Sequence, residues 1–511
     1  MSNKTVIGLD NSLKLLVKSS MIILISIILA KFLGYLHRII IARYLGPETY
    51  GLFSIAIMVL GFFVALSSLG LTDGILRFIP LYRGKKETKK INYILKFTII
   101  ILAISSVIFA LLLFLSSEFI SINIFHNKSL VVYLKIFSFL LPISIFANLF
   151  LSVLRAYEET KFSSIIQNIV QNFIKLLFFI IFIYFGFKTS GVIFSFFLGT
   201  FAMLVASYLV CKYKIPELFL KSKISTVQKK QITNNLFSYS WPIIIIGTIG
   251  NIMYWIDSFS IGYLKSAVDV GFYNAAVPIA MLFAIASDIF AQLFFPLITR
   301  EYSANNLKLI KELTKQISKW IFIINLPLFL IILLFPGTII NVLFGSEYLV
   351  AENALRILAI GSFFLSISVV STHLLSMIGK SKFMLYNLLA FSVINLLLNI
   401  ALVNLYGING AAFSTMLCTI LSGSVFVYQA YKYLKVIPFK KNMLKIFFIS
   451  IIPLLIVVIL RYFIPLNLLS LALIGFLFVT LYFLLIYFAG CLDENDKIVL
   501  KAVYRKIFAI F

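Results

Sequence analysis

Long apolar runs, separated by short polar connections, follow one another along the whole chain. A bilayer core of roughly 30 Å needs about 20 apolar residues in a helix, and fourteen segments meet that requirement. They are residues 15–41, 50–78, 93–117, 130–154, 163–186, 190–211, 237–263, 271–298, 320–345, 353–378, 383–405, 409–433, 443–463 and 467–490. The pattern predicts an all-α polytopic membrane protein with about 14 transmembrane helices.

Composition and charge agree with this prediction. Hydrophobic residues make up 62% of the chain and charged residues only 12%, whereas soluble domains carry about 25% charged residues. The net charge of +26 would suggest nucleic acid in a soluble protein, but most of the 44 lysines and arginines fall in alternate connections. Because basic residues collect on the cytoplasmic side of membrane proteins, we expect a cell-membrane protein with both termini cytoplasmic and no nucleic-acid partner.

Two similar stretches indicate an internal repeat. "ARYLGPETYGLF" (42–53) returns in blurred form as "GYLKSAVDVGFYNAA" (262–276), about 220 residues later. Further matches, at offsets of 221 and 219, join Gly186 with Gly407 and Gly191 with Gly410. An even number of spans per repeat gives two lobes of the same orientation, related by an axis along the membrane normal. The predicted domains are an N-terminal six-helix lobe (1–213), a cytoplasmic basic linker (214–235), a C-terminal six-helix lobe (236–435) and two additional helices with a cytoplasmic tail (436–511).

Basic residues lie inside the spans of the first half, where burying a charge is costly and therefore indicates function. Lys31 and Arg38 are seven residues apart and share one helix face, with His37 beside them, and Lys175 lies midway along the fifth span. We expect these residues, together with Arg77, to line a lumen that binds an anionic head group. Asp73 precedes Arg77 by four residues, so mutual neutralisation of the two is an alternative.

The second half carries acids and amides instead. Asp257, Asn395, Asn399, Ala411 and Thr415 are candidate cation ligands, because carboxylate, amide, hydroxyl and carbonyl oxygens suit a small hard cation. Polar contacts between packed helices are the alternative explanation for the two asparagines. Na⁺ or H⁺ is the candidate coupling ion, and we expect no other metal and no cofactor.

A third set of residues suggests gating or structural roles. Gly46 and Pro47 end the first span and start the next turn, with Glu48 beside them. Asp73 and Asp288 are further acids near or within spans for which a structural or gating role is expected.

Several of these stretches resemble one family. They are "LGPETYG" (45–51), "SLGL" (68–71), "YSWP" (239–242), Asp257 and "GFYNAA" (271–276). The chain resembles the polysaccharide-export branch of the multidrug/oligosaccharidyl-lipid/polysaccharide exporter superfamily. The resemblance implies two MATE-like lobes and a flippase that moves a lipid-linked oligosaccharide from the cytoplasmic to the outer leaflet by alternating access. The candidate cation residues also resemble the sodium site of some lipid II flippases, in which an acid is usual at the position of Asn399.

Alternative functions stay open at this point. A cation-coupled multidrug antiporter of the same superfamily would need an acidic pocket, and a non-transporting assembly partner would have no continuous cavity. The chain has no HExxH, no P-loop and no nucleophile elbow, so we expect a transporter and not an enzyme. The expected partners are a polyisoprenoid-linked oligosaccharide, the bilayer, and glycosyltransferases and a polymerase or ligase of the same pathway. We expect a monomer.

Overall fold

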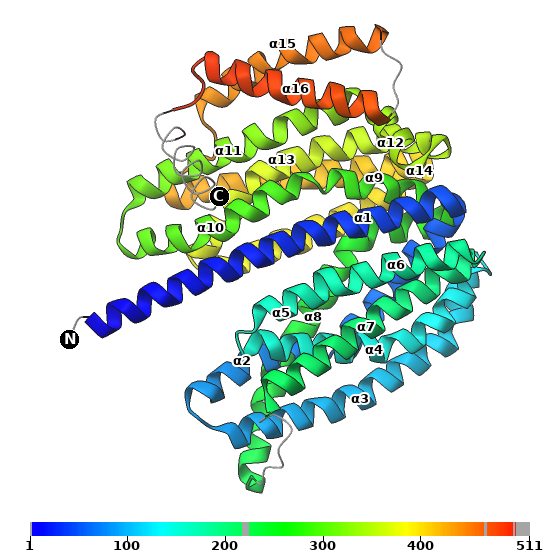
Figure 1. Ribbon diagram of the computed structural model, residues 1–511, viewed down its shortest axis with the longest axis vertical. Helices are drawn as coiled ribbons and strands as arrows, with labels where there is room; N and C mark the ends of the chain where they lie inside the picture. The colour runs from blue at the N-terminus through cyan, green and yellow to red at the C-terminus, as the bar shows by residue number, and fades with distance from the viewer. Residues whose placement is uncertain (1–2, 217–223, 464–467, 494–495, 497–511) are drawn as a thin grey trace. The chain divides into compact units, whose positions relative to one another are not determined.

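The computed structural model describes residues 3–216, 224–463, 468–493 and 496. Within these ranges nearly every residue is helical and there is no strand (Figure 1), which confirms the predicted all-α fold. The chain packs as two units, Met1–Asn274 and Ala275–Phe511, called here the N-terminal unit and the C-terminal unit. The helices up to that boundary are α1 (Asn3–Ser67), α2 (Leu71–Gly84), α3 (Thr88–Phe119), η1 (Ile120–Ile124), α4 (Leu130–Ala156), α5 (Thr160–Ile165), η2 (Ile166–Val170), α6 (Gln171–Tyr184), α7 (Thr189–Lys214), α8 (Thr226–Leu264) and α9 (Ala267–Ala280), which crosses it.

The C-terminal unit continues from α9. Its helices are α10 (Phe283–Ser303), α11 (Leu307–Leu334), α12 (Pro336–Phe344), η4 (Ser346–Ala351), α13 (Glu352–Met377), α14 (Ser381–Leu434), α15 (Lys441–Phe463) and α16 (Leu468–Phe488). Packing groups α8 with the first unit, whereas the repeat assigns it to the second lobe, so the predicted lobe boundaries stay a prediction. Of the predicted linker, residues 217–223 lie outside the described residues, and from Thr226 onward it forms the first turns of α8.

Fewer candidate spans stand out among the described residues than the fourteen predicted. Ten described helices are long and apolar enough to cross a membrane, or eleven if the bent pair Ala267–Ala280 and Phe283–Ala291 forms one span. The count of fourteen is therefore not confirmed. Part of the difference arises because two pairs of predicted spans each lie in one helix, interrupted by a single non-helical glycine: Gly46 in α1 and Gly407 in α14.

The break at Gly46 reverses the chain. Gly46 has φ 78° and ψ 176°, a backbone conformation that glycine adopts readily, and Pro47 then starts the next helical segment with its fixed φ. In Figure 1 the long helix α1 runs toward the right-hand edge, and the chain then returns to α2 at the left. The helix thus breaks at the residues where the sequence predicts one span to end and the next to begin.

Backbone packs directly on backbone where the two repeat stretches meet. A Cβ on Gly51 would lie 1.7 Å from the Ala267 carbonyl oxygen, and one on Gly271 would lie 2.1 Å from the Pro47 oxygen. Gly51 and Gly271 are equivalent positions of the repeat, 220 residues apart in the numbering. Only residues without a side chain allow this crossing of α1 and α9, called here the glycine crossing.

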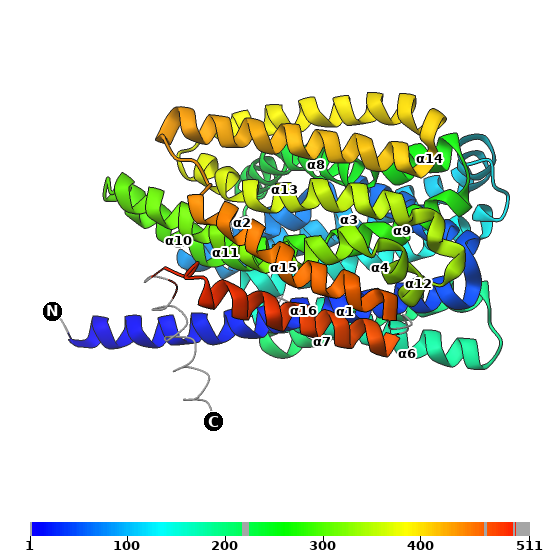
Figure 2. The ribbon, with the colours of Figure 1, turned by 90° about the horizontal axis from the view of Figure 1, so that it is seen from above.

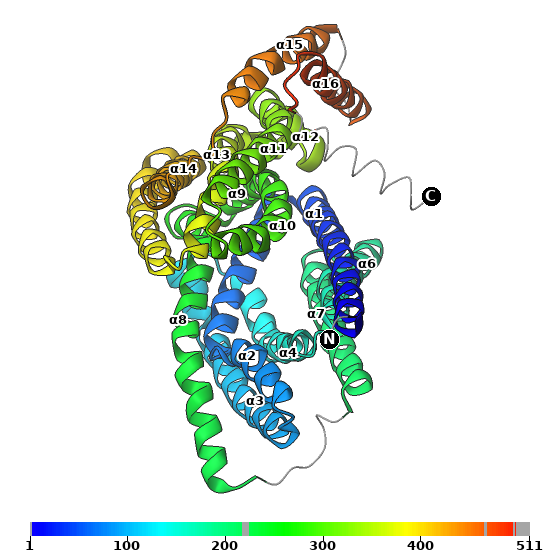
Figure 3. The same cartoon turned by 90° about the vertical axis from the view of Figure 1, so that its left-hand side faces the viewer.

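Small residues continue this packing along the rest of the second span. A Cβ on Gly70 would lie 2.4 Å from the Ser240 carbonyl oxygen, and one on Gly74 would lie 2.5 Å from Leu236 Cδ1. In Figure 3 α8 runs beside α2. Helices in a membrane associate through such small residues because lipid supplies no hydrophobic driving force between them. This close packing explains why α8 belongs to the N-terminal unit.

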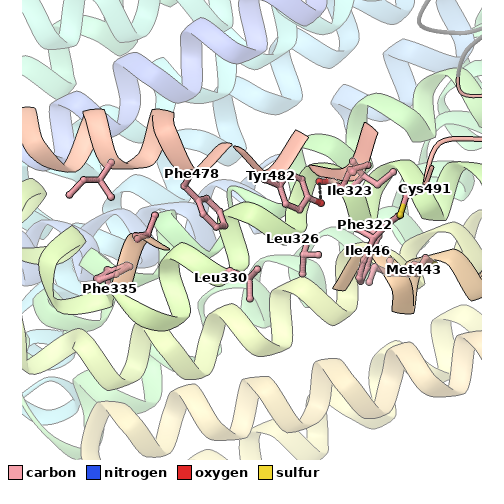
Figure 4. Packing of buried hydrophobic residues seen from close by; sticks show 14 residues of the cluster. Phe322, Ile323, Leu326, Leu330, Phe335, Met443, Ile446, Phe478, Tyr482 and Cys491 are labelled. Carbon is pink, nitrogen blue, oxygen red and sulfur yellow. Dashed lines mark hydrogen bonds between the residues drawn. The ribbon is translucent and has the colours of Figure 1, made fainter. Parts of the chain in front are cut away.

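Helices α15 and α16 form an appended pair in the C-terminal unit, and they lie side by side in Figure 2. Their apolar faces pack on α11, where the Tyr482 hydroxyl donates to the Ile323 carbonyl at 2.9 Å (Figure 4). At one end of the pair, the Lys319 ammonium of α11 is fully buried and donates to Asp493 at 3.0 Å and to Asp496 at 2.5 Å. Lys440 also donates to Asp493. These four charged residues are called here the clasp.

Candidate functional site

Three of the predicted substrate residues come together in the N-terminal unit. His37 and Arg38 lie on α1, and Lys175 lies on α6 within electrostatic reach of both. The Lys175 ammonium lies 4.8 Å from the centre of the Phe196 ring. The His37 ring packs edge-on against Phe179, with centroids 5.1 Å apart. The structure therefore gathers two basic side chains and an imidazole in an aromatic surrounding, called here the basic cluster.

Close packing fixes the position of Lys175. Helix α7 passes against α6 at Gly199, where an added Cβ would lie 3.0 Å from Lys175 Cβ and 2.8 Å from the Gln171 carbonyl oxygen. Any larger residue at position 199 would push α6 away from α7. The glycine thus sets how deeply the lysine sits, and the flexible part of the side chain begins only beyond Cβ.

Arg38 connects the basic cluster to the glycine crossing. Its guanidinium donates a hydrogen bond to the Tyr50 hydroxyl, and that hydroxyl donates to the Asn274 carbonyl at 2.9 Å. Tyr50 is only 1% exposed and follows the Gly46 break by one helical turn. The predicted gating segment therefore has a direct hydrogen-bonded path to a predicted substrate residue.

The described residues supply no acidic partner to the basic cluster. Among the described residues, neither Arg38 nor Lys175 forms an ion pair with a carboxylate. The Nε2 atom of His37, which is 3% exposed, also has no hydrogen-bond partner within the described part of the chain. Uncompensated charge at membrane depth is costly, and the binding of an anion here stays a prediction.

A row of polar side chains continues from Lys175 toward the start of α5. The Lys175 ammonium donates to Asn172 Oδ1 at 3.2 Å, and Asn172 donates to the Asn168 carbonyl at 2.9 Å. Asn168 Nδ2 donates to Ser164 Oγ at 3.0 Å and to Ser26 Oγ of α1 at 3.3 Å. These five residues are called here the polar ladder.

Only part of this ladder was predicted from the sequence. Asn168 and Asn172 are evident as polar neighbours of Lys175, but Ser164 and Ser26 escape notice because serine is common in apolar helices. A usable signal was present, since positions 164, 168 and 172 recur every four residues and therefore lie on one helix face.

Lys31 and Arg77 lie in other surroundings. Lys31 is half-buried, with no hydrogen bond or ion pair to another described residue. The exposed Arg77 guanidinium lies 4.2 Å from the centre of the Tyr239 ring on α8. Asp73 is also exposed and lies near Arg155, and no ion pair joins it to Arg77. The alternative that Asp73 and Arg77 neutralise each other is therefore not supported, and the substrate role of Lys31 and Arg77 stays a prediction.

The candidate cation residues fall into two groups, one in each unit. In the N-terminal unit the Tyr273 hydroxyl donates to Asp257 Oδ2 at 2.5 Å. In the C-terminal unit Asn395 donates to Thr415 Oγ1 at 3.1 Å, and Asn399 donates to Asn395 Oδ1 at 3.0 Å. Ala411 and Asn399 are completely buried. Each group is internally hydrogen-bonded, and the cation site stays a prediction.

The remaining acids with expected gating or structural roles are on the surface of their units. Glu48 is exposed just after the Gly46 break. Asp288 is exposed on α10, within electrostatic reach of His373 on α13. Their roles stay predictions.

Comparison with known proteins places the chain. A family model described as "Polysaccharide biosynthesis protein" matches residues 16–301. The chain belongs to this family. A second model, MatE, matches residues 242–401, which agrees with the predicted superfamily and with a multi-pass membrane protein.

Two curated relatives of the family member are informative. The putative O-antigen transporter of Shigella flexneri is 26% identical over 390 residues, covering 75% of this chain and 89% of the relative. The probable low-salt glycan biosynthesis flippase Agl15 of Haloferax volcanii is 30% identical over 200 residues, covering 38% and 42%. Among solved structures, the lipid II flippase MurJ in an inward closed conformation matches with a TM-score of 0.70 and 18% identity, covering 91% of this chain and 99% of that one. This last likeness establishes the fold.

Proposed function

We propose that this family member is a flippase that moves an oligosaccharide, carried on a polyprenyl phosphate or diphosphate, from the cytoplasmic to the outer leaflet by alternating access. Such a lipid has an anionic group between an apolar tail and a polar glycan. The tail stays in the bilayer, and the phosphate and glycan need a polar path through it. The named activities of the O-antigen transporter and of Agl15 support this substrate class.

The uncompensated basic cluster is the observation that carries the proposal. Arg38 and Lys175 supply hydrogen-bond donors and two positive charges at membrane depth, and phosphate oxygens are the acceptors that such groups bind best. Moving a phosphate out of water costs free energy, and this cost is offset only if charged hydrogen-bond donors replace the water around it. The Phe179 and Phe196 rings beside the cluster exclude water and strengthen the attraction.

The same observation disfavours an antiporter for cationic drugs. Two unpaired cations would repel such a substrate, whereas an acid would attract it. The carboxylate of Asp257 is the acid of the seventh span, and it accepts a hydrogen bond from Tyr273. Drug antiport is therefore the second candidate function, because a cationic drug would have to bind away from the basic cluster.

Orientation, partners and coupling complete the proposal. The alternation of basic connections supports a cell-membrane protein with both termini cytoplasmic, so the substrate would be built by glycosyltransferases on that side and consumed by a polymerase or ligase outside. Na⁺ or H⁺ is the proposed coupling ion. The protein is proposed to act as a monomer.

Reconstituted flipping tests the proposal. Purified protein is placed in liposomes with a polyprenyl diphosphate oligosaccharide, and glycan exposed on the outer leaflet is measured with an added glycosidase. Lys175→Met combined with Arg38→Gln should lower the flipping rate at least about tenfold, the effect of losing one charged hydrogen bond of about 1.5–3 kcal/mol.

The matched control is Lys135→Met. Lys135 is also a lysine within a span, but it is partly exposed and pairs with Glu118 at 2.8 Å, so its removal should leave flipping unchanged. Equal flipping by the double variant and the wild type, at equal amounts of folded protein, would reject the basic cluster as the anion path.

A further inference from the structure

We propose that the polar ladder of Ser26, Ser164, Asn168, Asn172 and Lys175 is a binding subsite for uncharged hydroxyl groups of a glycan, adjacent to the anion subsite at Lys175 and Arg38. This inference rests on the proposed flippase function and deepens it, because it names the part of the substrate that the basic cluster leaves unrecognised.

The ladder has the geometry of an extended subsite. Positions 164 to 175 cover about 16 Å along a helix axis at 1.5 Å per residue, and each member contacts the next through a hydrogen bond. Its inner end is the ammonium of Lys175, which is also a member of the basic cluster. A ligand with a charged group followed by neutral polar groups matches this order of residues.

Unused hydrogen-bonding capacity along the ladder points to a ligand. Both donors of Asn168 are engaged, by Ser164 and Ser26, but its Oδ1 acceptor receives no donor from the described residues. The ammonium of Lys175 has three donors, and the one hydrogen bond that it makes within the described chain goes to Asn172. Polar groups at membrane depth cost free energy when unpaired. A hydroxyl both donates and accepts hydrogen bonds, so sugar hydroxyls can donate to Asn168 Oδ1 and accept from the Lys175 ammonium.

The local helix geometry supports the same conclusion. Residues Ile166–Val170 form a π-helical turn in the middle of the ladder. Such turns are rare inside α-helices and are frequent at functional sites. Here the turn contains Asn168, the residue that connects the ladder to Ser26 of α1.

Polar contact between packed helices is the competing explanation, because α1 packs on α5 and α6. The two explanations predict different effects of mutation. Contacts that only join helices lower stability when removed and affect all ligands alike. A glycan subsite discriminates between a lipid with a sugar and the same lipid without one.

Binding measurements with two probes test the subsite. The full-length protein in nanodiscs is titrated with a short-chain polyprenyl diphosphate and with the same lipid carrying a disaccharide. The wild type should prefer the disaccharide lipid. Asn168→Leu and the milder Ser164→Ala should each reduce this preference about fivefold, the value of one neutral hydrogen bond of about 1 kcal/mol, and should leave affinity for the bare diphosphate within about twofold.

Matched controls separate the possible outcomes. Gln167→Leu alters an exposed neighbour of Asn168 and should change neither affinity. If Asn168→Leu and Ser164→Ala lose equal affinity for both lipids and unfold at a lower temperature, the ladder only joins helices. If neither variant loses affinity for either lipid, the subsite is also overturned. Lys175→Met should weaken the binding of both lipids, and if it weakens the binding of neither, the basic cluster that carries the proposed function is not the anion site.

Discussion

A single buried lysine shows how far one residue can be from its partners in sequence. Lys319 lies on α11, and it donates to the Cys491 carbonyl at 2.8 Å as well as to Asp493 and Asp496. All three of its donors are therefore used. Trp320 also donates to Asp496 at 2.7 Å. In the sequence Lys319 looks like one more basic residue at the end of a cytoplasmic connection, because no local pattern reveals partners more than 170 positions away.

Lys319→Met should release the appended helix pair from α11. Removing one partner of a buried ion pair leaves uncompensated charge and costs about 3–5 kcal/mol. We expect faster hydrogen exchange in α15 and α16 and little change in α1 to α7. Lys311→Met, an exposed change on the same helix, should have no such effect. Unchanged exchange in α15 and α16 would mean that the apolar packing of Tyr482 and Phe478 holds the pair without the clasp.

Acid should loosen the same contact in a predictable pH range. Burial by itself would raise the pKa of Asp493, but the hydrogen bonds from Lys440 and Lys319 outweigh it and lower that pKa below its ordinary value. A carboxyl with a lowered folded-state pKa contributes stability above its unfolded pKa of about 3.9, and this contribution is lost as pH falls through the folded value. The protection of α15 and α16 from exchange, corrected for the intrinsic exchange rate at each pH, should thus stay constant between pH 8 and 5 and should fall only below about pH 4.

Helix packing at the glycine crossing leaves no room for any side chain at positions 51 and 271. Gly51 and Gly271 let α1 and α9 touch backbone to backbone, and Tyr50 carries a hydrogen bond from Arg38 to the same place. Phosphate binding at Arg38, as proposed above, would alter that hydrogen bond, so we expect the crossing to respond to substrate binding.

Gly51→Ala should force this crossing apart. The added Cβ would lie 1.7 Å from a carbonyl oxygen, and backbone cannot move aside as a side chain can. We therefore expect overpacking to lower the free energy of unfolding by about 1–3 kcal/mol or more. Gly271→Ala should act in the same way. Gly34→Ala is the control, because nothing lies within 4 Å of its Cβ position and alanine favours a helix interior by about 0.5–1 kcal/mol. Thermal unfolding in detergent measures all three, and equal midpoints for Gly51→Ala and Gly34→Ala would contradict the tight crossing.

Helical elements and their breaks were largely predictable, because each depends on local chemistry. Apolar length predicts spans, and Gly46 followed by Pro47 predicts the reversal. The repeat also identified Gly186 and Gly407 as equivalent, and both have positive φ, 80° and 56°. Long-range pairing was not predictable. The Ser26 contacts of the ladder and the Lys319 ion pairs of the clasp join positions more than 130 residues apart, and residues with such partners carry no distinguishing local pattern.

Energy coupling concerns the whole molecule, because an ion gradient would have to drive the complete transport cycle. Asp257 supplies the one formal negative charge of the set, and Asn395, Asn399 and Thr415 supply neutral oxygens. A site with a single carboxylate binds a monovalent cation weakly, since affinity rises with the number of charged ligands. Sodium coupling, if Asp257 provides it, should therefore depend strongly on that residue.

Asp257→Ala should abolish stimulation of flipping by an imposed sodium gradient while slow flipping without a gradient continues. Proteoliposomes with sodium outside, inside or on both sides measure this directly. Asp269→Ala is the matched control, because Asp269 is an acid of the same unit whose partner is Ser266 at 2.5 Å.

Asn399→Leu should lower the apparent affinity for stimulating sodium about tenfold, which corresponds to about 1.4 kcal/mol. If both residues act on one ion, the double variant should be no worse than Asp257→Ala, because contributions to one site are not additive. Sodium stimulation that survives Asp257→Ala would exclude this residue as the ion ligand, and a response to a pH gradient in its place would identify the proton as the coupling ion.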